Sequence, residues 1–276
     1  MRERAFEIGC PRRLLVTALA AAAALLAAPP GRAAEIMPHR ALYTMSLARA
    51  NSDAGVTGAS GTMAYQWGET CDGWTVEQRY RLKMGYSDSQ DVNIASSFVT
   101  WESKDGLQYR FNQKETRNGK ESDEIRGTAH LDGRGEGGVA EFEKAAGKSF
   151  KLPKGALFPS SHTILLIDKA KAGENFISKQ VFDGATVDGS VLVSAVIGPK
   201  VEPDAEAAKK SPLLNRPGWR VRLAFFPADP KAEEPDYELG MLLLDNGVSR
   251  DMVIDYGDYA IHAKLDDVEA LDKPHC

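Results

Sequence analysis

The feature that most constrains the fold of this chain is an alternation of apolar and polar residues that recurs along most of its length. In the stretch 74–84, one parity carries the apolar residues: Trp74, Val76, Tyr80, Leu82 and Met84. The other parity is polar or charged. This period of two predicts a long strand with one buried face and one solvated face. Leu107, Tyr109 and Phe111 alternate with polar neighbours in the same way.

Further stretches predict additional strands: 39–49, 60–68, 91–102, 121–131, 138–144, 176–183, 189–198, 218–226, 236–245 and 248–265. Seven Asx–Gly pairs accompany them: Asp72-Gly73, Asp105-Gly106, Asn118-Gly119, Asp132-Gly133, Asp183-Gly184, Asp188-Gly189 and Asn246-Gly247. Such pairs supply the positive φ angles that tight hairpins require. They favour a mostly β fold built as a meandering antiparallel sheet.

One helix is predicted at 160–172. Ser160 is its N-cap candidate, an apolar run follows, and Gly173 is placed at the C′ position. The helix is expected to be largely buried. It divides a single β-rich domain, 34–276, into two halves: 34–155 and 174–276.

Two segments are rich in proline and charged residues, 199–217 and 227–235. They are interpreted as flexible surface loops. The alternative is that they gate a cleft or contact a partner. The sequence does not separate these roles.

Residues 1–33 have the layout of a secretory signal. Basic residues precede an uncharged apolar core over 14–28, and small residues favour cleavage near Ala33. An uncleaved membrane anchor is the alternative. Cys10 precedes the apolar core, so it is not a lipoprotein cysteine. Arg12-Arg13 raises a twin-arginine signal, but the general export route is favoured. No later segment is apolar enough to span a membrane, so we expect a soluble periplasmic protein.

The net charge argues against two classes of partner. Residues 1–33 contain five Arg and two Glu, so their removal takes the net charge from −5 to −8. An acidic chain of this kind is not expected to bind nucleic acid or anionic membrane surfaces.

Two cysteines remain after removal of the leader, Cys71 and Cys276. An even count in an exported chain predicts a disulfide. The alternatives are two free thiols or a bond between two molecules.

Local motifs do not indicate catalysis. Gly147-Lys148-Ser149 resembles the end of a phosphate-binding loop, but Phe142 stands where that loop needs its first glycine. Ser161 and His162 are adjacent on the predicted helix, so they point about 100° apart and do not form a dyad. His162 is expected to bond nearby backbone instead.

Local motifs do not indicate a metal site or an aromatic binding site either. The histidines lack metal-ligand spacing and no Cys-x-x-Cys occurs, so no metal or cofactor is predicted. Asp255-Tyr256-Gly257-Asp258-Tyr259 is interpreted as a strand with a glycine bulge rather than a site. The four tryptophans fit a core first, although an apolar groove for an acyl chain would use the same residues.

The chain resembles the EipB cell-envelope-integrity proteins of alphaproteobacteria. Four stretches carry the likeness: Gly155-Ala156-Leu157-Phe158-Pro159 leading to His162 and its helix, Val181-Phe182-Asp183-Gly184, Asn246-Gly247-Val248-Ser249-Arg250, and Asp255-Tyr256-Gly257-Asp258-Tyr259. The positions of Cys71 and Cys276 match as well. The likeness extends over the whole chain after the leader.

The resemblance implies a periplasmic, non-enzymatic protein. Its fold would be a spiral of antiparallel strands in two halves with one helix in a concave surface, similar in outline to LolA, LolB and RseB. A periplasmic tetratricopeptide-repeat protein would be the partner, and Cys71 and Cys276 would form the family's internal disulfide. Cys276 departs from the pattern because no residues follow it.

Three hypotheses follow for function. The leading one is a non-enzymatic scaffold that maintains the envelope by binding a protein. The alternative is a carrier or sensor that binds a lipid or lipoprotein acyl chain in a concave β surface. A hydrolase is the third. A carrier needs an apolar cleft of a few hundred Å³. A scaffold needs an exposed binding surface, and a hydrolase needs a nucleophile, a base and an orienting group in reach of one another.

Overall fold

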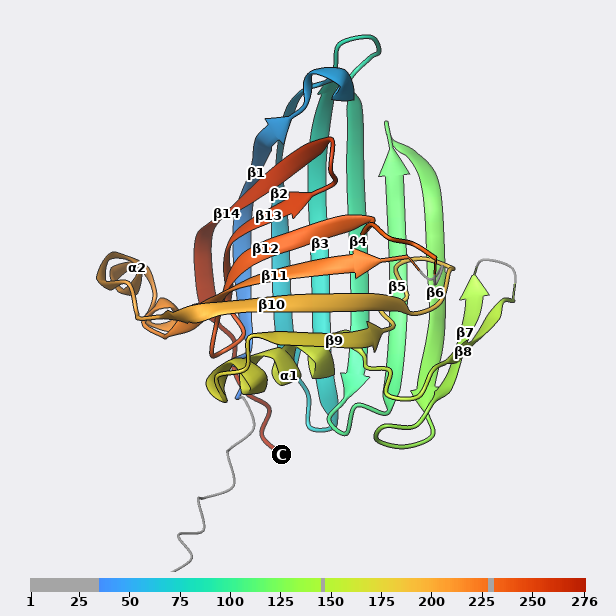
Figure 1. Ribbon diagram of the computed structural model, residues 1–276, viewed down its shortest axis with the longest axis vertical. Coiled ribbons are helices and arrows are strands. Elements are labelled where there is room, and N and C mark those ends of the chain that lie inside the picture. The colour runs from blue at the N-terminus through green and yellow to red at the C-terminus, as the bar shows by residue number, and fades with distance from the viewer. Residues whose placement is uncertain (1–34, 145–146, 228–230) are drawn as a thin grey trace, which may run out of the picture. The chain divides into compact units, whose positions relative to one another are not determined.

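The computed structural model describes residues 35–144, 147–227 and 231–276, and these form a fourteen-stranded antiparallel sheet (Figure 1). The strands are β1 His39–Ala50, β2 Val56–Glu69, β3 Gly73–Tyr86, β4 Val92–Ser103, β5 Gln108–Arg117, β6 Lys120–Leu131, β7 Gly138–Lys144, β8 Ser149–Leu152, β9 Phe176–Val181, β10 Val191–Val201, β11 Gly218–Phe226, β12 Tyr237–Leu244, β13 Ser249–Asp255 and β14 Tyr259–Ala270. The predicted fold class, mostly β with a meandering antiparallel sheet, is confirmed.

The order of the strands places the first and the last strand side by side in the middle of the sheet. The order is β8-β7-β6-β5-β4-β3-β2-β1-β14-β13-β12-β11-β10-β9. The first strand therefore pairs with the last, with Met45 opposite Ala263. This junction joins an N-terminal half, β1–β8, to a C-terminal half, β9–β14. Figure 1 shows strands of the C-terminal half running across those of the N-terminal half.

Tight turns connect several neighbouring strands, and five of the seven predicted Asx–Gly pairs have a glycine with positive φ; Gly73 and Gly133 do not. Asn118 and Gly119 both have positive φ, 51° and 76°, in the turn between β5 and β6. Gly106 and Gly247 have φ of 74° and 91° in the β4–β5 and β12–β13 turns. These conformations are costly for residues that have a Cβ atom, so the glycines help to fix the hairpins.

The helix α1, Pro159–Lys171, connects the two halves. Its buried face includes Leu166, Ile167 and Ala170, which pack on the C-terminal half. The predicted C-terminus is correct, because Gly173 (φ 80°) donates to the Ala170 carbonyl. The predicted N-cap is wrong. Ser160 lies inside the helix, and the N-cap position is Phe158, which has no capping side chain.

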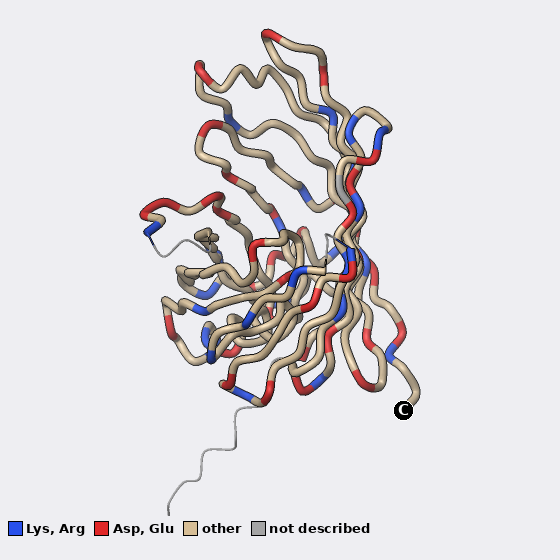
Figure 2. Tube along the Cα trace, turned by 90° about the vertical axis from the view of Figure 1, so that its right-hand side faces the viewer, with Lys and Arg blue, Asp and Glu red and all other residues tan. Residues whose placement is uncertain are grey.

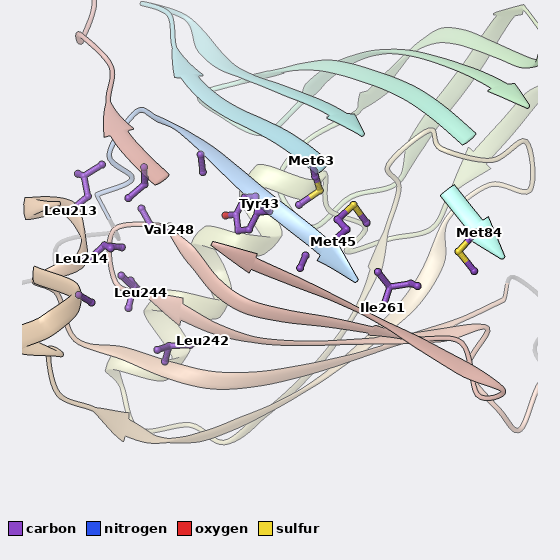
Figure 3. Packing of buried hydrophobic residues seen from close by; sticks show 14 of the residues in the cluster. Tyr43, Met45, Met63, Met84, Leu213, Leu214, Leu242, Leu244, Val248 and Ile261 are labelled. Atoms are coloured by element: carbon purple, nitrogen blue, oxygen red, sulfur yellow. The ribbon is translucent and has the colours of Figure 1, made fainter. Parts of the chain in front are cut away.

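Two further core clusters accompany the one that packs against α1. One contains residues from β1, β2, β3, β12 and β14, and Figure 3 shows Tyr43, Met45, Met63 and Ile261 among them. A second cluster is aromatic and lies over β5–β8, where Tyr109 stacks on Phe158 at 4.8 Å. Figure 2 shows that residues of both charge signs are interspersed along the strands and turns.

Two predictions about segments are corrected. The single strand expected at 248–265 is two strands, because Gly257 (φ 84°) makes a hairpin turn that Tyr256 N–H closes on the Tyr259 carbonyl. The loop expected at 199–217 contains helix α2, Ala205–Lys210, and a 3-10 turn, Pro212–Leu214. Leu213 and Leu214 are buried in the core, so this segment is anchored by apolar packing.

The predicted leader, residues 1–33, lies outside the described residues, as do three positions of the loop 227–235. Within the described part of the chain, neither helix has the length and apolar character needed to cross a bilayer.

Candidate functional site

A cavity of about 650 Å³ lies between the two halves of the sheet. Because side chains alternate across each strand, one face of β1–β3 and one face of β11–β14 point into it. Five methionines line it: Met45, Met63, Met84, Met241 and Met252. Leucine, isoleucine and valine side chains fill much of the remaining wall. The apolar parity predicted for 74–84 contributes Tyr80, Leu82 and Met84.

Seven tyrosines from both halves contribute hydroxyl groups to the wall. Tyr43 donates to the Ser249 carbonyl at 2.9 Å. Burial raises the pKa of Tyr65 and Tyr237 far above the ordinary value, and that of Tyr256 to about 12. Their hydroxyl groups are therefore neutral at physiological pH and add no charge to the wall.

The cavity wall is exposed at Tyr256, in the turn between β13 and β14. Tyr256 lines the cavity and is 44% exposed. Its ring stacks on Tyr259 at 5.1 Å. Glu115 and Arg117 of β5 also line the cavity and form an ion pair at 2.9 Å. The cavity wall thus includes a stacked tyrosine pair and a charged pair.

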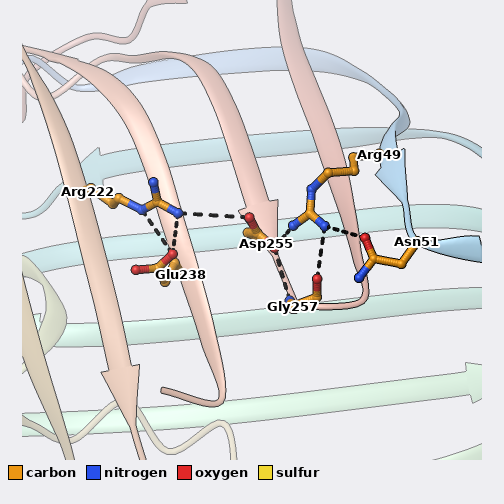
Figure 4. Close-up of polar contacts among 6 residues, drawn as sticks. All are labelled: Arg49, Asn51, Arg222, Glu238, Asp255 and Gly257. Carbon is orange, nitrogen blue, oxygen red and sulfur yellow. Dashed lines mark hydrogen bonds and ion pairs between the residues drawn. The ribbon is translucent and has the colours of Figure 1, made fainter. Parts of the chain in front are cut away.

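Ion pairs fix the strand ends beside Tyr256 (Figure 4). Asp255 at the end of β13 accepts from Arg49 of β1 at 2.6 Å and lies 3.9 Å from Arg222 of β11. Arg49 also donates to the Gly257 carbonyl at 3.0 Å. The Asp255–Tyr259 motif is therefore a hairpin turn whose acid is paired and whose tyrosines line the cavity, not a bulged strand.

Helix α1 forms part of the cavity wall. Pro159, His162, Thr163 and Leu166 line it. His162 is 5% exposed, and burial lowers its pKa to about 4, so the ring is neutral at pH 7. The expected bond from this ring to nearby backbone is not made through Nε2, which has no hydrogen-bond partner among the described residues.

A buried carboxylate positions this helix. Glu102 of β4 is 1% exposed and accepts the backbone N–H groups of Ser160 (2.7 Å) and Ser161 (2.8 Å). The Ser161 hydroxyl donates to the same carboxylate at 2.5 Å. Burial raises the pKa of Glu102, and these hydrogen bonds oppose the rise. Ser161 therefore faces Glu102 while His162 faces the cavity. The sequence contains no local signal that links Glu102 to a helix 58 positions away.

The tryptophans and the phosphate-loop motif have structural positions. Trp67 lines the cavity and meets Trp74 edge-on at 6.2 Å, and Trp219 is buried beside α1. Trp101 lies beneath Arg110. Ser149 begins β8 directly after the glycine and lysine of the motif. Among the described ranges, no group of three or more His, Cys, Asp or Glu is arranged to hold a metal ion.

Cys71 and Cys276 are adjacent in the structure. Their Cα atoms lie 5.7 Å apart, within the range that a disulfide spans, and their sulfurs are in bonding contact. Cys71 stands in the turn between β2 and β3. The chain end is also held near the first strand, because Leu271 N–H donates to the Pro38 carbonyl. Formation of the bond in the protein remains a prediction.

Comparisons with known proteins agree with this architecture. The profile of the EipB-like family matches residues 30–272. The cell envelope integrity protein EipB of Brucella abortus is 31% identical over 89% of this chain and 88% of its own length. A solved structure from the same organism, described as a β-barrel-like protein with a domain of unknown function, has a TM-score of 0.80 and 31% identity. That match covers 87% of this chain and 100% of the solved one. The chain therefore belongs to the EipB-like family.

Proposed function

We propose that this chain maintains cell-envelope integrity from the periplasm by holding the apolar chain of a lipid or lipoprotein in the cavity between the halves of its sheet. The observation that carries the proposal is the cavity itself. Its volume of about 650 Å³ lies within the roughly 300–1,000 Å³ typical of small-molecule sites. The name of the Brucella relative supports the envelope role.

The composition of the wall suits an apolar guest of variable shape. Methionine side chains are flexible and polarizable, so Met63, Met84 and Met241 adapt to different chain conformations. The neutral tyrosines add aromatic area without an ionic cost. The predicted leader supports a periplasmic location. In this proposal the protein binds its ligand without changing it chemically, so no catalytic residue or cofactor is needed.

A charge placed in the cavity tests the proposal. Leu239 of β12 lines the cavity, between Leu223 and Ile254 on the neighbouring strands. Leu239→Lys should abolish recovery of lipid when the protein is crosslinked in envelope extract, purified and examined by mass spectrometry for lipids and proteins. Leu192→Lys is the matched control, because Leu192 is exposed on β10 and does not line the cavity. Equal lipid recovery from all three proteins, or none from the unaltered chain, would refute the proposal.

A protein-binding scaffold is the second candidate, and an exposed apolar patch favours it. Phe176 of the edge strand β9 is 55% exposed, and Val196, its partner on β10, is 58% exposed. Exposed apolar side chains next to a sheet edge suit strand or helix docking. The tetratricopeptide-repeat protein implied by the resemblance is the proposed partner. Val196→Lys should remove that partner from the pulldown and leave lipid recovery unchanged.

A further inference from the structure

Two side chains in the described lining of the cavity are exposed to solvent, Arg117 and Tyr256. The Arg117 side chain is 61% exposed and Tyr256 is 44% exposed. The other described lining residues are buried or half-buried. These two residues therefore mark where the cavity wall meets solvent.

Arg117 and Tyr256 belong to one cluster of charged and aromatic side chains. Tyr256 stacks on Tyr259 at 5.1 Å. Burial raises the pKa of Tyr256 to about 12, and the charge of Glu115 adds to the rise. Burial also raises the pKa of Tyr259, which the charge of Arg117 opposes. Such electrostatic effects weaken with distance, so both members of the ion pair lie near the tyrosine stack.

Two tyrosines of β3 complete this group. Burial raises the pKa of Tyr80, and the charge of Glu115 raises it further. Tyr86 acts on the pKa of Tyr259 in the same direction as burial does. We call the group the mouth cluster, and it consists of Tyr80, Tyr86, Glu115, Arg117, Tyr256 and Tyr259, all of which line the cavity.

The ion pair of the mouth cluster keeps free hydrogen-bonding capacity. The Arg117 Nε–H donates to Oε1 of Glu115 at 2.9 Å. A guanidinium has five N–H donors, so the two Nη groups of Arg117 retain donors for a ligand. The Ser122 hydroxyl also donates to Oε1 of Glu115. The second carboxylate oxygen therefore remains for a cation.

We propose that the ligand is a lipid with a zwitterionic head group, an ammonium joined to a phosphate, and that this head group binds the mouth cluster. The proposal rests on the proposed function and names the class of its ligand. The phosphate accepts from the Nη groups of Arg117. The ammonium lies against Glu115 and the tyrosine rings, and the acyl chain extends among the methionines.

The charges of the cavity favour a zwitterion over a head group of one sign. Apart from tyrosine, the ionisable side chains in its described lining are Glu115, Arg117, His162 and Asp183. Burial lowers the pKa of His162 to about 4 and raises that of Asp183, which disfavours the charged form of both. An anionic head group at the ion pair would attract Arg117 but repel Glu115, and a cationic one would do the reverse. A zwitterion satisfies both partners.

The chemistry of the mouth cluster matches each half of that head group. Alkylammonium ions bind the faces of aromatic rings, and cages of such rings recognise choline. The neutral rings of Tyr256 and Tyr259, with the Glu115 carboxylate near them, offer this combination. Phosphate is recognised well by guanidinium groups, whose donors fit two of its oxygens at once. Arg117 supplies those donors.

Four surfactants with the same dodecyl chain test the proposal: dodecylphosphocholine, dodecyl phosphate, dodecyltrimethylammonium and dodecyl maltoside. Each displaces the fluorophore N-phenyl-1-naphthylamine from the full exported chain at pH 7, below its critical micelle concentration. Because the chain is constant, differences in affinity report on the head group. We expect dodecylphosphocholine to bind most tightly.

The two charged residues should give opposite patterns. Arg117→Gln should weaken dodecylphosphocholine and dodecyl phosphate roughly fivefold without weakening dodecyltrimethylammonium. Glu115→Gln should weaken dodecylphosphocholine and dodecyltrimethylammonium roughly fivefold without weakening dodecyl phosphate. Tyr256→Leu should weaken only the two surfactants that carry an ammonium. Dodecyl maltoside should bind all three variants as it binds the unaltered chain.

Arg126→Gln and Glu143→Gln are the matched controls. These residues form an ion pair at 2.9 Å between β6 and β7, and neither lines the cavity. Their replacement should leave the order of the four affinities unchanged. A general loss of stability weakens all four surfactants together, so it does not imitate the opposite patterns.

The outcomes separate this proposal from the proposed function. If all four surfactants displace the fluorophore but Arg117→Gln and Glu115→Gln change every affinity by the same factor, the head-group proposal is wrong and the proposed function stands. Tightest binding of another head group to the unaltered chain would overturn it without any variant. If no surfactant displaces the fluorophore, the proposed function fails, and the head-group proposal fails with it.

Discussion

The carboxylate of Glu102 on β4 accepts the backbone N–H of Ser160 across 2.7 Å, which links the N-terminal half of the sheet to the first turn of α1. A helix leaves its first N–H groups without intrahelical partners, and here a side chain from a distant strand satisfies two of them. The contact fixes the helix that forms part of the cavity wall.

Replacement of this carboxylate should destabilise the fold. Glu102→Ala leaves the buried N–H groups of Ser160 and Ser161 unpaired, so the free energy of unfolding should fall by about 3 kcal/mol. Urea denaturation measures the change. Ser161→Ala is the control, because it removes only the hydroxyl bond and should cost about 1 kcal/mol. Losses of equal size in the two variants would argue against capping by Glu102.

His162 should make the fold sensitive to acid. Its pKa is lowered from 6.5 to about 4 in the folded protein, so the unfolded chain binds the proton more readily. Stability is therefore lost as the pH falls from about 6.5 to about 4, by about 3 kcal/mol from this residue. His162→Phe should lose correspondingly less stability between pH 7 and pH 4 in urea titrations. Groups that both proteins share, such as His39, cancel in the comparison. Identical pH profiles would contradict the shift.

Affinity should increase with the length of the ligand chain. Each buried methylene contributes about 0.8 kcal/mol, so binding should tighten roughly fourfold per carbon until the cavity is full. Displacement of a bound fluorophore, N-phenyl-1-naphthylamine, by 1-alkanols of increasing length measures this dependence. Leu239→Lys should flatten it, whereas the exposed variant Leu192→Lys should retain it. A flat series for the unaltered chain would show that the cavity does not hold the chain.

A bond between the two cysteines predicts that replacing either one, or both, lowers the stability by about the same amount. A bond between Cys71 and Cys276 closes a loop of 205 positions, for which the chain-entropy model gives an upper value of about 5 kcal/mol. Cys71→Ser and Cys276→Ser should lower the melting temperature about equally, and the double variant should add little. Mass measurement after alkylation, before and after reduction, checks the bond directly. Additive losses in melting temperature, or two alkylated thiols in unreduced protein, would exclude it.

Two turn glycines should respond differently to alanine. Gly247 has φ +91°, and an added Cβ would lie 3.0 Å from Ile36, whereas Gly119 has φ +76° and open space around it. Gly119→Ala should cost about 1 kcal/mol for its backbone conformation alone. Gly247→Ala should cost more, because Ile36 is buried and does not move freely. Thermal unfolding of the two variants gives the comparison, and a smaller loss at Gly247 would contradict it.

The sheet was predictable because its signals are local. Alternation over 74–84 identifies β3 and the face that lines the cavity, and Asn118-Gly119 identifies a hairpin. The same reasoning failed at Tyr256-Gly257-Asp258, where a bulge and a turn have similar composition. It also failed at 199–217, where prolines suggested a loop although Leu213 and Leu214 are buried.

The site itself was less accessible to prediction. A cavity depends on the spacing between two halves of a sheet, which no single stretch of sequence encodes. The sequence offered a carrier only as the alternative to a scaffold, since residues such as Trp67 suit a core and a groove equally. Glu102 was missed for a similar reason: a capping residue is normally sought beside the helix, and this one comes from another strand.

The pairing of β1 with β14 has a consequence for synthesis and folding. A chain that emerges from its N-terminus can complete β1–β8 early, but one edge of β1 stays open until residues 259–270 arrive. Such an edge is a template for pairing with other chains. Closure across the whole length of the sequence also slows folding. The chain is therefore most prone to pair with other chains in the interval before its last strand is available.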